Sequence, residues 1–251
     1  QQPLLTAGVA MSLVQHHSRS EQVTAWHSPL NTSLPDMPTY AELQTEQVYR
    51  DELVTLELDG LVTALCKFYD VPRTNGGTRG DNHHLSGGHR SQAWIKNSRF
   101  CTNRTYATEP GLNGEQARWI SAFDITLPAE HMLTISRNAD RATRSGQLEE
   151  LVEWFGNVDG NTTVDGWNNI ENRVASSDSS HLWHFHGRIK RALMNQMWAM
   201  TKIYTALTGQ TEPLSGGIVE LSSILPAPKA GTNVGDALAG AWKTAERIAD
   251  G

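Results

Sequence analysis

Three histidines lie within six residues of this chain, in the segment SSHLWHFH at positions 179–186. In an extended strand, alternate side chains face the same side, so His184 and His186 would share one face. Trp183 and Phe185 would then point the other way, toward a core, and His181 would stand at the entry to the strand. Spacings of three and then two residues do not share one helical face. Because buried imidazoles need polar partners, this pattern is typical of a metal site or an acid–base site.

The remaining ligands of such a site would come from elsewhere in the chain. The two cysteines, Cys66 and Cys101, are not at metal-binding spacing and are expected to be free thiols, so a metal would rest on histidines and carboxylates. His89 follows a Gly-, Asn- and Arg-rich loop at 73–88. Asp124 is a lone carboxylate in the apolar segment 117–127, where it needs a cation, an ion-pair partner or several donors. Catalytic zinc usually takes three protein ligands and keeps one open position, so these residues can complete a zinc site.

Five short motifs resemble one family of enzymes. They are GGHRSQ at 87–92, NRTY at 103–106, AFDI at 122–125, SSDSSHLWH at 176–184 and HLWHFH at 181–186. Together they resemble the peptidoglycan-cleaving zinc metallopeptidases that include D-Ala-D-Ala carboxypeptidases, L-Ala-D-Glu endopeptidases and lysostaphin-like enzymes. The nearest resemblance is to an actinobacterial and actinophage branch. It covers roughly residues 80–207.

This resemblance implies a role for each polar residue of the motifs. Zinc would be bound by His89, Asp124 and His186. His184 and His181 would form the acid–base or transition-state-stabilising pair, since a metal acidifies a bound water and a nearby imidazole can relay its proton.

The chain departs from the family pattern between the first histidine and the aspartate. His89 and Asp124 are 35 residues apart, so residues 90–119 must form an insertion that loops out and returns. His83 or His84 are alternatives to His89 as the first ligand. Two further residues are expected to contact substrate: Arg90 through a carboxylate, and Trp167 by stacking from a loop rim.

We expect an α+β fold, in which a small antiparallel sheet carries the site and helices pack on one side. The resemblance implies that this fold is like that of the D,D-peptidases. Helices are expected within 40–69, 129–144 and 189–207, and a strand within 117–127. Segment 147–155 is ambiguous, and 156–180 reads as a long turn-rich loop. The expected divisions are an irregular arm at 1–40, a zinc peptidase-like domain at 41–207, and a linker with a short C-terminal helix at 208–251.

Composition excludes several classes of partner. The net charge of −6 argues against a nucleic-acid binder, and no apolar run approaches the roughly 20 residues of a membrane span. The mean hydropathy of −0.44 is that of a soluble, globular chain. Because the chain begins at Gln1 rather than Met, we expect it to be processed, trimmed or part of a longer sequence.

The expected function is therefore a zinc-dependent hydrolase of peptidoglycan stem peptides, either an endolysin or a virion-associated hydrolase of a bacteriophage. It would act in the cell wall or on the virion, after residing in the host cytoplasm if it is an endolysin, with peptidoglycan and other virion proteins as partners. One alternative is a structural virion or tail protein that keeps the peptidase fold, with or without zinc. The other is a sugar- or peptide-binding module that uses Trp94, Trp119 and Trp167.

Overall fold

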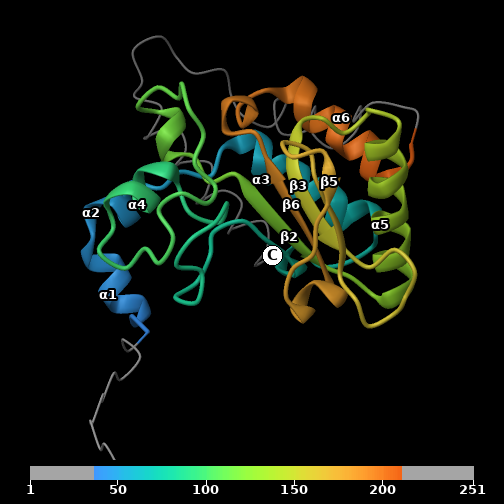
Figure 1. Cartoon of the computed structure of the whole chain (residues 1–251), viewed down its shortest axis with the longest axis horizontal. Coiled ribbons are helices and arrows are strands. Elements are labelled where there is room, and N and C mark those ends of the chain that lie inside the picture. The colour runs from blue at the N-terminus through green and yellow to red at the C-terminus, as the bar shows by residue number, and fades with distance from the viewer. Residues whose placement is uncertain (1–36, 211–251) are drawn as a thin grey trace, which may run out of the picture. The chain divides into compact units, whose positions relative to one another are not determined.

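The computed structural model describes residues 37–210, so most of the predicted arm and tail, including the predicted short C-terminal helix, lies outside the described residues. The fold is α+β, as predicted, with a six-stranded antiparallel sheet in the order β1-β2-β6-β3-β4-β5 (Figure 1). The strands are β1 (Gly76–Gly77), β2 (Ala122–Thr126), β3 (Leu151–Gly156), β4 (Asp165–Asn168), β5 (Arg173–Val174) and β6 (His184–Ile189). The helices are α1 (Tyr40–Thr45), α2 (Gln47–Arg50), α3 (Leu56–Phe68), α4 (Gln92–Asn97), α5 (Ala129–Arg144) and α6 (Met197–Thr208).

One face of the sheet is covered by α3, α5 and α6 (Figure 1). Phe123 of β2, Trp154 of β3 and Phe185 of β6 are buried in this core among leucines of α3, Ile135 of α5 and aliphatic residues of α6. Strands β2 and β6 alternate apolar and polar residues because only one of their faces is packed on helices. The polar face of β2 and β6 is therefore free to carry a functional site.

A smaller second core lies beside the sheet and contains the insertion at 90–119. It is built from Leu43 of α1, Tyr49 of α2, Trp94 and Ile95 of α4, and Ala107. The insertion thus has its own packed core rather than being an open loop. It returns to the sheet where Ser121 and Ala122 donate backbone hydrogen bonds to the Gly88 carbonyl, at 2.9 and 3.1 Å.

Gly88 is required at this junction by close packing. A Cβ atom at Gly88 would lie 2.8 Å from the Ala122 Cβ and 2.7 Å from the Arg188 Cδ. Because real Cβ contacts are not that short, only glycine lets the loop before His89 lie directly on β2.

Several element boundaries differ from the sequence predictions. The helix predicted to begin at 189 begins at Met197, because β6 continues to Ile189 and a 3-10 turn follows it. The helical segment 40–69 is three separate helices. The loop predicted at 156–180 contains β4 and β5, two short strands within a Gly- and Asn-rich segment that hid the strand signal. The ambiguous segment 147–155 contains most of β3.

Candidate metal and acid–base site

The register of β2 and β6 brings three polar side chains to the same face of the sheet. Asp124 is the direct cross-strand partner of His186, and Thr126 is the partner of His184. Directly opposed residues of an antiparallel pair point to the same face. Asp124, His184 and His186 therefore line one cavity, whereas Phe185 between the histidines is fully buried on the helical face.

His89 reaches this face from the loop that ends at Gly88. Its Nδ1 donates to the Thr78 carbonyl at 2.7 Å, which fixes the ring and leaves Nε2 directed at Asp124. The His89 Nε2 lies 3.0 Å from Asp124 Oδ2 and 3.2 Å from His186 Nδ1. The His186 Nδ1 lies 2.8 Å from Asp124 Oδ1. Residues that are 97 positions apart in sequence thus meet in one compact group.

This group has the donor types and spacing of a metal site. Zinc bonds of about 2.0–2.1 Å in tetrahedral geometry place two ligand atoms roughly 3.3 Å apart, close to the three separations above. A carbonyl oxygen on the other ring nitrogen of His89 is the usual support for a metal-binding imidazole. The residues present therefore fit a small divalent cation.

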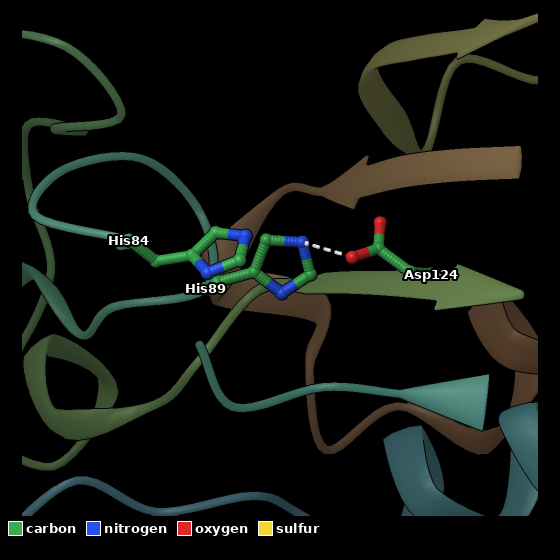
Figure 2. A group of neighbouring side chains, drawn as sticks. All are labelled: His84, His89 and Asp124. Atoms are coloured by element: carbon green, nitrogen blue, oxygen red, sulfur yellow. Dashed lines mark ion pairs between the residues drawn. The ribbon is translucent and has the colours of Figure 1, made fainter. Parts of the chain in front are cut away.

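His84 is a further member of this environment. His84, His89 and Asp124 can hold a metal ion, since one ligand atom from each lies within 4.8 Å of the others (Figure 2). His84 Nδ1 also lies 2.9 Å from Asp81 Oδ1, in the loop that the sequence gives as an alternative source of the first ligand. Its contacts with Asp124 are looser than those of His186.

The charges of the group are strongly coupled. Burial alone would raise the pKa of Asp124, but the neighbouring His89 and His186 hold that pKa well below its ordinary value. Burial also opposes charging of His89, yet the Asp124 carboxylate outweighs it and raises the pKa of His89. In contrast, burial lowers the pKa of His186. A bound cation would take the place of the proton between His89 and Asp124.

Two more imidazoles lie beside this group. The His184 Nε2 is 3.8 Å from Asp124 Oδ1, and burial lowers the pKa of His184 to about 4, so its ring is neutral near pH 7. The His181 ring centroid is 4.5 Å from that of His184, and its Nδ1 donates to the Asp178 carbonyl at 3.2 Å. His181 lies in the 3-10 turn Ser179–Leu182, just before β6. All five residues predicted as ligands or proton carriers therefore lie together.

The group forms part of the wall of a cavity of about 640 Å³. Its other walls come from the 74–77 segment, the 83–88 loop, Tyr106 and the 177–183 segment. Trp183 is 56% exposed and lines this cavity, so the prediction that it points to the core is wrong. The preceding 3-10 turn ends at Leu182, and Trp183 therefore lies outside the alternation of β6.

Arg90 does not bind substrate in this arrangement. Its side chain is fully buried between the rings of Tyr49 and Trp94, each 4.9 Å from the guanidinium carbon. The guanidinium donates to Glu52 at 3.2 Å and to the His84 carbonyl at 2.7 Å. The prediction of a substrate-binding Arg90 is wrong, because the guanidinium is buried and already engaged by Tyr49, Trp94 and its hydrogen-bond acceptors. Arg90 instead holds the loop that carries His84.

The three tryptophans predicted to form a binding groove do not share a surface. Trp94 and Trp119 are buried in different cores, at 0% and 5% exposure. Trp167 of β4 is the cross-strand partner of Trp154 of β3. It packs on the helical face of the sheet, away from the site histidines. The expected stacking of Trp167 on a ligand in the site is therefore wrong. The strand at 165–168, which the loop prediction missed, explains its orientation.

A second buried ion pair supports the polar face of the sheet. Arg188 of β6 donates to Glu153 of β3 at 2.7 Å, and the Tyr106 hydroxyl donates to the same carboxylate at 2.5 Å. Burial would raise the pKa of Glu153, but Arg188 and Tyr106 lower it below its ordinary value. The sequence analysis missed this pair, because only the β3–β6 register joins the two residues.

We expect Glu153→Gln to destabilise the metal-free protein by about 3 kcal/mol near pH 7, because it leaves Arg188 buried without its partner. A group whose pKa is lowered on folding stabilises the protein above its unfolded pKa, and that contribution is lost as the pH falls through the folded pKa. The difference in free energy of unfolding between wild type and variant should therefore shrink in acid, below about pH 4. Urea denaturation at several pH values measures this difference.

Glu171→Gln is the matched control for this prediction. Glu171 pairs with Arg173 at the surface, where both side chains are at least 50% exposed, so its loss should cost less than about 1 kcal/mol. Equal destabilisation by the two variants, or a difference independent of pH, would contradict the role assigned to Glu153.

Both cysteines are free, as predicted, and burial raises the pKa of Cys66. No helix in residues 37–210 combines the length and apolar character that a membrane span requires.

Comparisons with protein-family models, with curated proteins and with solved structures found no match. The site must therefore be interpreted from its own geometry.

Proposed function

We propose that this chain is a zinc-dependent peptidase that hydrolyses an amide bond in peptidoglycan stem peptides. One observation carries the proposal: His89 Nε2, the Asp124 carboxylate and His186 Nδ1 converge within 3.2 Å of one another at an open cavity. Two further imidazoles beside them supply proton carriers. The motif resemblance supports the substrate class, and with it a role as a phage lysin or virion-associated wall hydrolase.

The residues of the site have distinct tasks in this reaction. When bound, zinc supplies Lewis-acid chemistry that polarises a carbonyl and acidifies water. His89 is kept in the tautomer that leaves Nε2 free, because its Nδ1 donates to the Thr78 carbonyl. Asp124 contributes the negative charge of the ligand set.

His184 is placed to move a proton in the same reaction. Its ring is neutral near pH 7, since burial lowers its pKa to about 4, and its Nε2 adjoins Asp124. A neutral imidazole accepts a proton from attacking water and later donates it to the leaving amine. His181, held by the Asp178 carbonyl, lies where a positive charge would stabilise developing negative charge on the substrate.

Metal analysis of the purified protein, together with a peptidoglycan hydrolysis assay, tests the proposal. We expect about one zinc ion per chain, loss of hydrolysis after chelation and recovery when zinc is added back. Removal of the metal should also lower the melting temperature, because ligand binding stabilises the folded state.

Two results would contradict the proposal in different ways. A protein that binds no metal and still cleaves peptidoglycan would exclude the zinc mechanism. A protein that binds zinc with the expected affinity but cleaves no peptidoglycan fragment would instead be a non-catalytic metal protein, as expected of a structural virion component.

A further inference from the structure

Two exposed aromatic rings lie at opposite ends of the group formed by His89, Asp124 and His186, which we call the His–Asp group. Trp183 precedes β6 and packs edge-on against His184, with ring centroids 4.8 Å apart. Tyr106 lies at the other end of β6, where its ring is 5.4 Å from the Arg188 guanidinium carbon. Both rings line the cavity, and their exposed fractions are 56% and 40%.

The two rings contact residues near opposite ends of β6. His184 and Arg188 are four residues apart on the strand, which corresponds to about 13 Å at 3.3 Å per residue. His186, one of the proposed ligands, lies midway between them. An extended peptide bound along this axis would therefore have about two residues on each side of the reacting centre.

The arginines next to the cavity are already engaged. Arg90 is buried against Glu52, and Arg188 is buried against Glu153. Within residues 37–210, the cavity wall includes no lysine or arginine. A substrate with a terminal carboxylate would therefore find histidines and Asp178 in this wall, but no guanidinium or ammonium group to pair with.

The cavity wall formed by the edge strand β1 also leaves room for a substrate peptide that passes through the site. Gly77 lines the cavity, and a Cβ atom built on it would meet nothing within 4 Å. A side chain at this position would project into open space without strain in the protein, since Gly77 has no left-handed backbone conformation. Gly77 is therefore a suitable place for a steric probe.

We infer that the cavity binds substrate on both sides of the His–Asp group, with Trp183 and Tyr106 as the two walls, and that the reaction cuts an internal amide bond. This inference rests on the proposed peptidase function and narrows its substrate to a peptide that continues past both sides of the scissile bond. Water is added across that bond, so the products are a new carboxylate and a new amine, each on a fragment of at least two residues.

A synthetic stem peptide made in two forms, with a free C-terminal carboxylate and with a C-terminal carboxamide, tests this inference on the zinc-loaded full chain. We expect kcat/KM for the two forms to agree within about threefold, whereas a site built to pair the carboxylate would favour it by more than about tenfold. Mass spectrometry should show fragments of two or more residues. Release of a single C-terminal residue from the free acid alone would overturn the inference and leave the peptidase function standing.

Variants of the two walls provide the second measurement. Trp183→Ala and Tyr106→Ala should each raise KM by about tenfold with a smaller change in kcat, because each removes apolar contact area. Trp198→Ala is the matched control, since Trp198 is also 56% exposed but lies on α6, outside this cavity. Tyr106→Phe keeps the ring and should retain most of the affinity.

A steric and a binding measurement complete the test. Gly77→Leu should weaken binding of both peptide forms, measured by fluorescence titration of the metal-free protein, without lowering its melting temperature. If Trp183→Ala and Tyr106→Ala both behave like Trp198→Ala, the two-sided site is wrong. If the zinc-loaded wild type cleaves neither form and no wall fragment, the proposed function fails and this inference fails with it.

Discussion

We expect His186→Ala to abolish metal binding and, with it, the proposed hydrolysis. His186 Nδ1 lies 2.8 Å from Asp124 and 3.2 Å from His89, so its removal opens the donor triangle on one side. Loss even of an outer-shell partner typically lowers metal affinity by 10–100-fold, so loss of this ligand should lower it by more than about 100-fold. Zinc titration by calorimetry measures the affinity, and a peptidoglycan assay with zinc in excess measures the remaining hydrolysis.

His84→Ala is the control that separates the two ligand sets. His84 can join His89 and Asp124 around a metal, but its contacts with Asp124 are looser than those of His186. We expect His84→Ala to keep zinc affinity within about tenfold of wild type. The opposite pattern, with zinc retained by His186→Ala and lost by His84→Ala, would assign the third ligand to His84.

A folding control is needed because His186 is buried in the central strand. The melting temperature of metal-free His186→Ala should be compared with that of metal-free wild type, and His186→Gln keeps more of the side-chain volume. Zinc binding that is lost in both variants while both remain folded would establish the loss as one of ligation.

His184→Ala has the second largest expected effect, and it should separate catalysis from metal binding. The His184 Nε2 is 3.8 Å from Asp124 Oδ1, whereas the ring nitrogens of His89 and His186 lie within 3.0 Å of the Asp124 carboxylate. Zinc affinity should therefore change by less than about tenfold. Positioned acid–base groups typically contribute 10²–10⁴-fold, so kcat should fall by a factor in that range. Steady-state hydrolysis and zinc titration of the same preparation measure both quantities.

His131→Ala is the matched control for this variant. His131 lies on α5, on the helical side of the sheet, and contacts Tyr69 rather than the cavity. Its replacement should change neither zinc affinity nor kcat. Loss of zinc in His184→Ala would mean that ligand and proton carrier have been exchanged between His184 and His186. Unchanged turnover with zinc bound would remove His184 from the reaction.

The spacing of residues within single strands predicted much of the site. In β6, the two-residue period placed His184 and His186 on one face and Phe185 in the core. The isolated Asp124 in an apolar segment predicted a carboxylate that needs a cationic partner, and the register of β2 puts His186 directly opposite it. These predictions succeeded because side-chain direction in a strand depends only on local backbone geometry.

The remaining features depend on long-range packing. Arg90 follows His89 directly in sequence, yet the second core buries it between Tyr49 and Trp94. Trp183 precedes His184 directly, yet a 3-10 turn leaves it exposed at the cavity. The direction of a side chain next to a site residue therefore depends on the backbone path, which is set by contacts with distant residues.

By itself, the sequence determined the chemistry available to this protein: a cluster of imidazoles and the Asp124 carboxylate in an apolar strand, with two strand faces of opposite polarity. Only the tertiary structure decided which of these groups meet. His89 joins Asp124 because the insertion after it folds on its own core and returns to Gly88, where a glycine allows the loop to lie on β2. The physical reason is that the alternation of side chains in a strand depends on local backbone geometry. Bringing ligands together instead requires closing long loops of the chain, and strand register and packing across the whole domain stabilise that closure.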